Sequence, residues 1–142
     1  MAGIFGTKAP LLADINLILL VGILVLLILG YMMMKRRRLR THGYIMLTVV
    51  VLKLISILLI MLPSARIILF EPSFAALVPI VAIHISIGAI TQAIGMYLVF
   101  VVWRLKEPIA SCFKSKRRMK PLLITWIFMI FLGIGLYYLL YI

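Results

Sequence analysis

Only a few side chains in this sequence have the chemistry to bind a metal or a cofactor, and they lie within or beside long apolar runs. The chain has two histidines, His42 and His84, and Met46 follows His42 by about one helical turn. Histidine and methionine are axial ligands of haem iron, and helix bundles hold haem between facing helices. His42, Met46 and His84 are therefore candidate haem-handling residues, with the iron at His84 or at His42. The alternatives are an interhelical hydrogen bond for His84 and a headgroup-level cap for His42.

The composition indicates which solvent surrounds these residues. Of the 142 residues, 66% are hydrophobic and 13% are charged, and the mean hydropathy is +1.29. Soluble domains are about 45–50% apolar and about 25% charged. We therefore expect an all-α integral membrane protein. The one cysteine, Cys112, excludes an intrachain disulfide framework.

Four apolar runs are each long enough to cross the hydrocarbon layer, which takes about 20 helical residues. They cover approximately residues 11–34, 44–62, 77–103 and 121–141. We expect the second run to end at Pro63 and the fourth to begin at Pro121, with residues 64–74 forming a loop at the outer interface. The predicted fold is one domain, residues 1–142, with four transmembrane helices in an up-down bundle.

Positive charge is concentrated in the first and third connections between these runs. Five basic residues lie in the first and seven in the third: Lys35, Arg36, Arg37, Arg38 and Arg40, then Arg104, Lys106, Lys114, Lys116, Arg117, Arg118 and Lys120. The positive-inside rule makes both loops cytoplasmic and both termini extracytoplasmic, in a multi-pass protein of the cell membrane. These loops attract anionic lipid headgroups. Nucleic acid is not an expected partner, because the basic runs lack interleaved aromatic residues.

Aromatic residues lie near both ends of the runs. We expect them to anchor the helices at the two interfaces: Tyr31, Tyr44 and Trp103 on the cytoplasmic side, and Tyr137, Tyr138 and Tyr141 on the outer side. Because anchoring accounts for the aromatic residues, we look for function among the polar residues inside the bilayer.

Polar and small residues recur at helical spacing on two of the runs. On the second run they are His42, Met46, Val49, Lys53 and Ser56, and on the third His84, Gly88, Thr91, Gln92 and Gly95. Each set shares one helix face, where small residues allow close approach and polar groups form interhelical bonds. We expect the two faces to meet inside the bundle. Asn16 adds an amide early in the first run.

Lys53 lies about ten residues into its helix, close to the middle of the bilayer. A charged lysine there costs roughly 2.5–3.5 kcal/mol on insertion scales. Gln92, at a similar depth, is the expected partner within the chain, and Asp14 is a weaker candidate. Three interpretations stay open: solvation by polar groups of the bundle, contact with an anionic cofactor group, and pairing with an acid on another subunit.

The depths of the two histidines argue against one haem held between them. They differ by roughly 20 Å along the bundle, whereas two axial nitrogens lie about 4 Å apart across an iron. A site with one histidine and one methionine stays open, because Met61 lies near the depth of His84 and Met46 lies one turn from His42. The sequence also lacks paired carboxylates on one helix, a phosphate-binding glycine loop and a nucleophile with a nearby base. We therefore expect a non-enzymatic protein with no metal beyond a candidate haem iron.

The order of these features resembles a known family. It is similar to the four-helix bacterial and archaeal membrane family, long of unknown function, that includes the haem–copper oxidase maturation factor CtaM. The similar features are Asn16, the pair Gly30-Tyr31, the basic run 35–40, His42 with Met46, Ile83-His84-Ile85-Ser86, Trp126, and a glycine-then-tyrosine ending at Gly133, Gly135, Tyr137 and Tyr138. Where the family has a histidine entering the fourth helix, this chain has Lys116, which indicates a divergent member.

The resemblance implies a protein that assists the assembly of a haem–copper terminal oxidase, or accompanies it, and handles haem. The alternative is a permanent accessory subunit of a larger respiratory or oxygenase complex, without a cofactor of its own. A transporter or channel is the weakest interpretation, because the four runs show no inverted repeat or broken helix.

Overall fold

The computed structural model describes residues 4, 6, 8–103 and 108–142, except the side chains of residues 101–103, 108–116 and 118. Every regular element in this part of the chain is helical, as the apolar runs predict. The elements are α1 (Leu11–Lys35), α2 (Leu39–Ser56), the π-helical η1 (Ile57–Met61), α3 (Leu62–Phe70), the 3₁₀ helix η2 (Pro72–Leu77), α4 (Val78–Met96), the π-helical η3 (Tyr97–Trp103) and α5 (Pro108–Tyr141).

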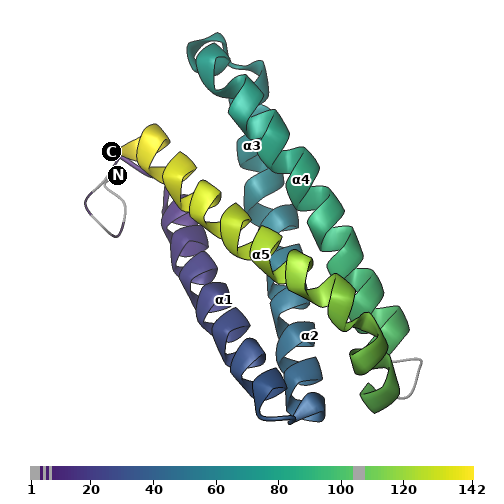
Figure 1. The fold of residues 1–142 in the computed structure, drawn as a ribbon. Coiled ribbons are helices and arrows are strands. Elements are labelled where there is room, and N and C mark those ends of the chain that lie inside the picture. Colours follow the sequence, from purple (N-terminus) through teal and green to yellow (C-terminus); the bar gives the residue numbers. More distant parts are fainter. Residues whose placement is uncertain (1–3, 5, 7, 104–107) are drawn as a thin grey trace.

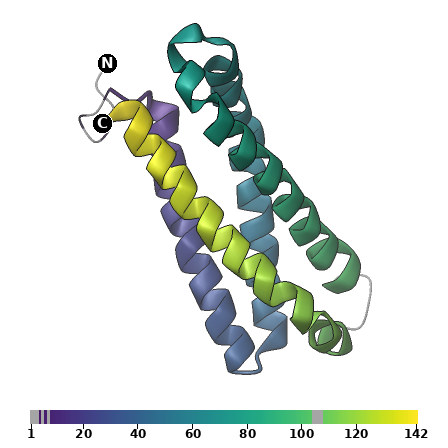
Figure 2. The ribbon, with the colours of Figure 1, turned by 45° about the horizontal axis from the view of Figure 1, so that its top comes forward.

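Four continuous helical stretches are long and apolar enough to cross a membrane: Leu11–Lys35, Leu39–Phe70, Pro72–Phe100 and Met119–Tyr141. Successive stretches run in opposite directions (Figures 1 and 2). α1 lies along α2, and α5 crosses obliquely to pack against α1, α2 and α4. The start of α1 and the end of α5 lie at the same end of the molecule. α5 therefore packs against both the hairpin of α1 and α2 and against α4.

The boundaries near prolines differ from those predicted. The second stretch begins at Leu39 and continues past Pro63 to Phe70, so the predicted loop over 64–74 is largely helical. Pro63 follows the π-helical turn and stands in the first turn of α3, inside a helical stretch that continues without a break. The chain is extended at Glu71, and η2 then starts the third stretch at Pro72.

The fourth membrane-length stretch, Met119–Tyr141, agrees with the predicted run to within two residues. The helix that contains it is longer than predicted: α5 begins at Pro108, and Pro121 lies inside the helix and does not start it. Pro121 removes one backbone donor, a loss that membrane helices tolerate where neighbouring helices and hydroxyl side chains compensate. The basic segment that precedes residue 121 is thus helical from residue 108.

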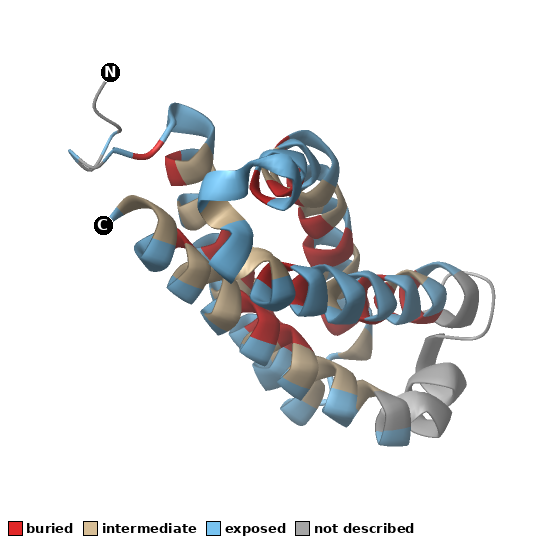
Figure 3. Ribbon diagram, turned by 90° about the horizontal axis from the view of Figure 1, so that it is seen from above, coloured by how far each residue is buried: buried red, intermediate tan, exposed pale blue. Residues whose placement is uncertain are grey.

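The core is a seam of apolar side chains between α1, α2, η3 and α5. It consists of Leu20, Ile23, Leu27, Val49, Val50, Val99, Trp126 and Ile130. Outside this seam, large apolar side chains such as Ile28, Leu59 and Phe131 are exposed. Figure 3 shows buried positions on the faces that the helices turn toward one another and exposed positions around the outside. This inverted distribution is that of a bundle whose outer surface contacts lipid.

Candidate functional site

The polar residues singled out on α2 and α4 line the interior of the bundle. On α2, His42, Lys53 and Ser56 are buried, and Met46 is half-buried; on α4, His84, Thr91, Gln92 and Gly95 are buried. The helical spacing therefore predicted the buried faces of both helices correctly. The partners of these side chains differ in part from those expected.

His42 binds α1 and does not act as an isolated cap at the headgroups. Its Nδ1 donates a hydrogen bond to the carbonyl oxygen of Gly30 at 2.8 Å. A Cβ atom at Gly30 would lie 3.7 Å from this nitrogen and 3.2 Å from Sδ of Met46. The missing side chain of Gly30 is thus what lets the first turns of α2 approach the last turns of α1. With the proton on Nδ1, the lone pair of a neutral His42 ring is on Nε2.

Asn16 and Ser56 join the same two helices near their other ends. The hydroxyl of Ser56 donates to Oδ1 of Asn16 at 2.6 Å, and Ser56 is fully buried. Together with the contact between His42 and Gly30, this bond fixes the antiparallel register of α1 and α2. Asn16, a candidate polar residue of the sequence, therefore has a role in joining two helices.

The predicted pairing of Lys53 with Gln92 is wrong. Nε2 of Gln92 donates to the carbonyl oxygen of Val50 at 3.0 Å, and its Oε1 has no hydrogen-bond partner in the described part of the chain. Gln92 thus ties α4 to the backbone of α2, about one turn from Lys53. Lys53 is 7% exposed, and no ion pair with a described Asp or Glu holds it. Asp14 is therefore not its salt-bridge partner either.

His84 lies in the interior between α4, α5 and α1. Its Cε1 lies 3.7 Å from the position of a Cβ on Gly133, which also faces Leu20. Nδ1 of His84 is buried and has no hydrogen-bond partner among the described residues. The interhelical hydrogen bond considered for His84 is therefore not made through Nδ1.

Sequence reasoning missed a buried contact between the first and last helices. Asp14 is fully buried, and its Oδ1 accepts a hydrogen bond of 2.5 Å from the hydroxyl of Tyr137. Tyr137, expected to be an interfacial anchor, is only 8% exposed. The signal in the sequence was the cost of an acid inside an apolar run, which predicts a buried partner. Thr91, in contrast, satisfies its hydroxyl locally, on the carbonyl oxygen of Ile87.

The arrangement does not fit a haem held by His42 together with either His84 or Met46. His42 is level with Gly30 and His84 with Leu20, a separation of about 15 Å along α1 at 1.5 Å per residue. Met46 and His42 approach Gly30 from the same face of α2, whereas axial ligands stand on opposite sides of the iron. Among the described residues, no group of three or more His, Cys, Asp or Glu could hold a metal ion.

One further surface was missed at the sequence level: a row of small residues on α4. Ala82, Ser86, Ala89 and Ala93 are all exposed, with spacing of three or four residues. They lie roughly opposite His84, Thr91 and Gly95 on the helix. The sequence does contain this second set of small residues at helical spacing on the same apolar run. The sequence alone does not show which of the two sets faces the interior of the bundle. We name these four residues the α4 ridge.

Comparison with known proteins finds no family model, no curated protein and no solved structure that matches this chain.

Proposed function

We propose that this chain is a non-catalytic membrane protein that docks onto a larger membrane complex, assisting its assembly or accompanying it. The resemblance of residues 10–142 to the oxidase-maturation family suggests a haem–copper terminal oxidase as that complex. In this proposal the protein lies in the cell membrane as an up-down bundle. Its two basic loops are cytoplasmic and both termini are outside, as the charge distribution favours.

The observation that carries the proposal is the outward-facing α4 ridge. Lipid tails solvate isoleucine as well as alanine, so lipid exposure alone does not call for small residues. Small residues at this spacing allow two helices to approach closely. Inside the bundle the same helix uses Gly95 in this way, because a Cβ there would lie 2.6 Å from the Trp126 ring. The α4 ridge offers a similar surface to a helix of another subunit.

Co-purification tests this proposal. We expect the tagged protein, extracted in a mild detergent, to retain subunits of a terminal oxidase that mass spectrometry identifies. Ala89→Leu and Ser86→Leu place bulk on the α4 ridge and should lower the retained oxidase at least tenfold. Ile83→Leu, an exposed position on the same helix that keeps its volume, is the matched control. Absence of oxidase subunits from the unmodified protein refutes the oxidase assignment. Retention of another complex through the ridge supports the accessory-subunit alternative.

A second candidate function is haem handling at His42, and one contact favours it. Histidines that ligate metals commonly donate their other ring N–H to a backbone carbonyl, and His42 does so to Gly30. In this candidate Nε2 of His42 would hold the iron as a single ligand, and haem would supply the redox centre destined for the oxidase. Any further ligand would come from outside the chain, which suits transfer better than permanent binding.

Absorption spectroscopy tests this second function. Addition of haemin to the apoprotein in detergent should give a Soret band that shifts on binding. His42→Ala should abolish the shift, whereas His84→Ala should leave it intact. A shift that survives His42→Ala would contradict ligation by His42.

A further inference from the structure

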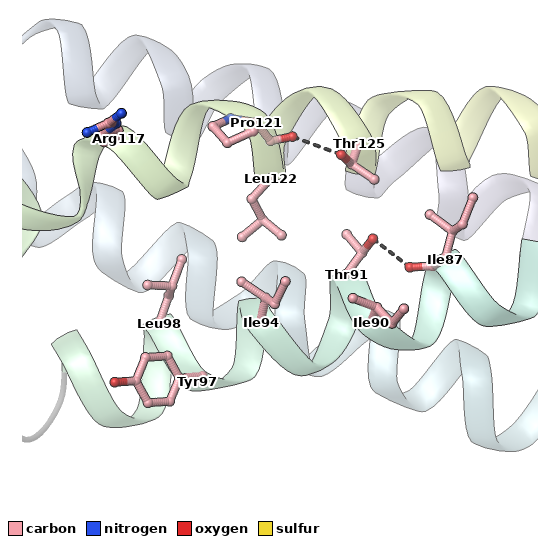
Figure 4. Close-up of a pocket in the computed structure, with 10 residues that line it drawn as sticks. All are labelled: Ile87, Ile90, Thr91, Ile94, Tyr97, Leu98, Arg117, Pro121, Leu122 and Thr125. Carbon is pink, nitrogen blue, oxygen red and sulfur yellow. Dashed lines mark hydrogen bonds between the residues drawn. The ribbon is translucent and has the colours of Figure 1, made fainter.

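A second apolar surface lies between α4 and α5, apart from the α4 ridge, and shares only Thr91 with the polar interior described above. It encloses about 860 Å³ between η3, α4 and the first half of α5. Isoleucines 87, 90 and 94 form much of one wall, and Leu122 reaches toward them from the other (Figure 4). Ile90 and Ile94 are exposed, so the space is open to the side. We name it the α4–α5 groove.

The two threonines in the groove do not make it polar. Thr91 donates its hydroxyl to the carbonyl oxygen of Ile87 at 2.6 Å, and Thr125 donates to that of Pro121 at 2.9 Å (Figure 4). Both hydroxyls are thus satisfied within their own helices. Over most of its length the α4–α5 groove therefore has no open hydrogen-bonding group and favours a hydrocarbon occupant.

One end of the groove is polar. Arg117, on α5, and Tyr97, at the start of η3, stand at the same end on opposite walls (Figure 4). Arg117 is exposed, and within the described part of the chain no carboxylate pairs with it. This end of the groove lies on the basic side of the molecule, because Arg117 and Lys120 both belong to the basic segment that precedes Pro121. A guanidinium there is suited to a phosphate, which it can bind through two parallel hydrogen bonds.

The length of the groove agrees with the depth of one lipid leaflet. The wall formed by α4 and η3 extends from Ile87 to Leu98, about 16 Å at 1.5 Å per residue. The hydrocarbon core of a bilayer is about 30 Å thick, so one leaflet supplies about 15 Å. The groove thus offers an apolar wall one leaflet long, with a cation and a phenol at the level of the headgroups.

We propose that the α4–α5 groove binds one anionic glycerophospholipid of the leaflet on the basic side, with an acyl chain along Ile90, Ile94 and Leu122 and the headgroup phosphate on Arg117. The occupant is a lipid and not a partner helix because the polar end carries positive charge, which complements an anionic headgroup. This site is independent of the proposed docking function, which uses the α4 ridge.

Native mass spectrometry of the purified full chain tests the proposal. The protein in detergent is mixed with equal amounts of phosphatidylglycerol and phosphatidylcholine of the same acyl length, and the retained lipids are counted. We expect one retained phosphatidylglycerol in preference to phosphatidylcholine. Arg117→Ala should reduce this preference about fivefold, since a basic residue near an anionic surface contributes about 1 kcal/mol. Arg36→Ala removes an exposed charge outside the groove and should leave the preference unchanged.

Two further arms separate the acyl-chain contact from charge attraction. Leu122→Trp narrows the groove and should lower retention of both lipids, with Ile94→Phe as a second filling variant if the first fails to fold by circular dichroism. Inorganic phosphate at 10 mM should not displace the lipid. Equal losses for Arg36→Ala and Arg117→Ala, displacement by phosphate alone, or undiminished retention in a folded groove-filling variant would each overturn the proposal.

Discussion

The hydroxyl of Tyr137 lies 2.5 Å from Oδ1 of Asp14 and joins the first and last helices of the chain, 123 residues apart in sequence. Both residues are buried, Asp14 fully so. The second carboxylate oxygen, Oδ2, has no hydrogen-bond partner among the described residues. Loss of the hydrogen bond from Tyr137 should therefore cost more free energy of folding than loss of a hydrogen bond at the surface.

Removing the Tyr137 hydroxyl should destabilise the bundle. Tyr137→Phe deletes a hydrogen bond to a buried carboxyl group, worth about 1.5–3 kcal/mol if the acceptor is charged. We expect a lower midpoint in thermal unfolding in detergent, followed by circular dichroism. Tyr138→Phe is the control, because Tyr138 is 57% exposed. In an Asp14→Ala background the effect of Tyr137→Phe should shrink, and an undiminished effect would show that the hydroxyl acts elsewhere.

Gly30 should tolerate only a small side chain. A Cβ there meets Sδ of Met46 at 3.2 Å and Cγ2 of Ile45 at 3.4 Å. Gly30→Leu therefore forces α1 and α2 apart, stretches the bond from His42 to Gly30, and should cost about 1–3 kcal/mol. Gly22→Leu on the same helix is the matched control, since nothing lies within 4 Å of its Cβ position. Unfolding midpoints that are equal for the two variants would contradict this account.

Gly95 should not accept even alanine without loss. The Cβ would lie 2.6 Å from Cζ2 and 2.8 Å from Cη2 of Trp126, a rigid ring that is 3% exposed. We expect Gly95→Ala to cost about 1–3 kcal/mol through overpacking and to change the tryptophan fluorescence spectrum as the ring moves. Gly135→Ala, with open space around its Cβ position, provides the comparison. If Gly95→Ala left both the fluorescence spectrum and the stability unchanged, α4 and α5 could move apart at this point without cost, and the prediction would be wrong.

Replacing Lys53 by methionine should stabilise the isolated protein. Lys53 is buried without an ion pair in the described part of the chain. A lone ammonium inside a bilayer costs about 2.5–3.5 kcal/mol on insertion scales, a cost that an apolar side chain of similar size avoids. We expect Lys53→Met to raise the thermal midpoint in detergent. Ser56→Ala, which removes the bond to Asn16, should lower it. A lower midpoint for Lys53→Met would show that the amine makes favourable contacts inside the bundle.

The proposed orientation can be tested with single cysteines. In a Cys112→Ser background, Arg37→Cys marks the turn between α1 and α2, and Ser73→Cys marks η2 at the opposite end of the second stretch; both positions are exposed. A membrane-impermeant maleimide applied to intact cells should label Ser73→Cys and spare Arg37→Cys. Inverted vesicles should reverse the pattern, and the same pattern in both preparations would contradict the orientation.

The sequence by itself determined the number of membrane-length helices and the buried faces of α2 and α4. Apolar length decides whether a segment can cross a bilayer, and the helical period decides which residues share a face. The predicted faces, from His42 to Ser56 and from His84 to Gly95, are those that the bundle encloses, with Met46 and Gly88 only half-buried. These features are local, so residues within a few turns specify them.

Only the tertiary structure decided which atom each polar group meets. Gln92 bonds to Val50 and not to Lys53, and Tyr137 bonds to Asp14 and not to the interface. Such partners depend on the rotation and the axial register of helices far apart in the chain. That register follows from close contacts such as Gly30 with His42 and Gly95 with Trp126. A shift of one residue along a helix rotates a side chain by about 100°, so the pattern that predicts a buried face leaves the partner on the facing helix undetermined.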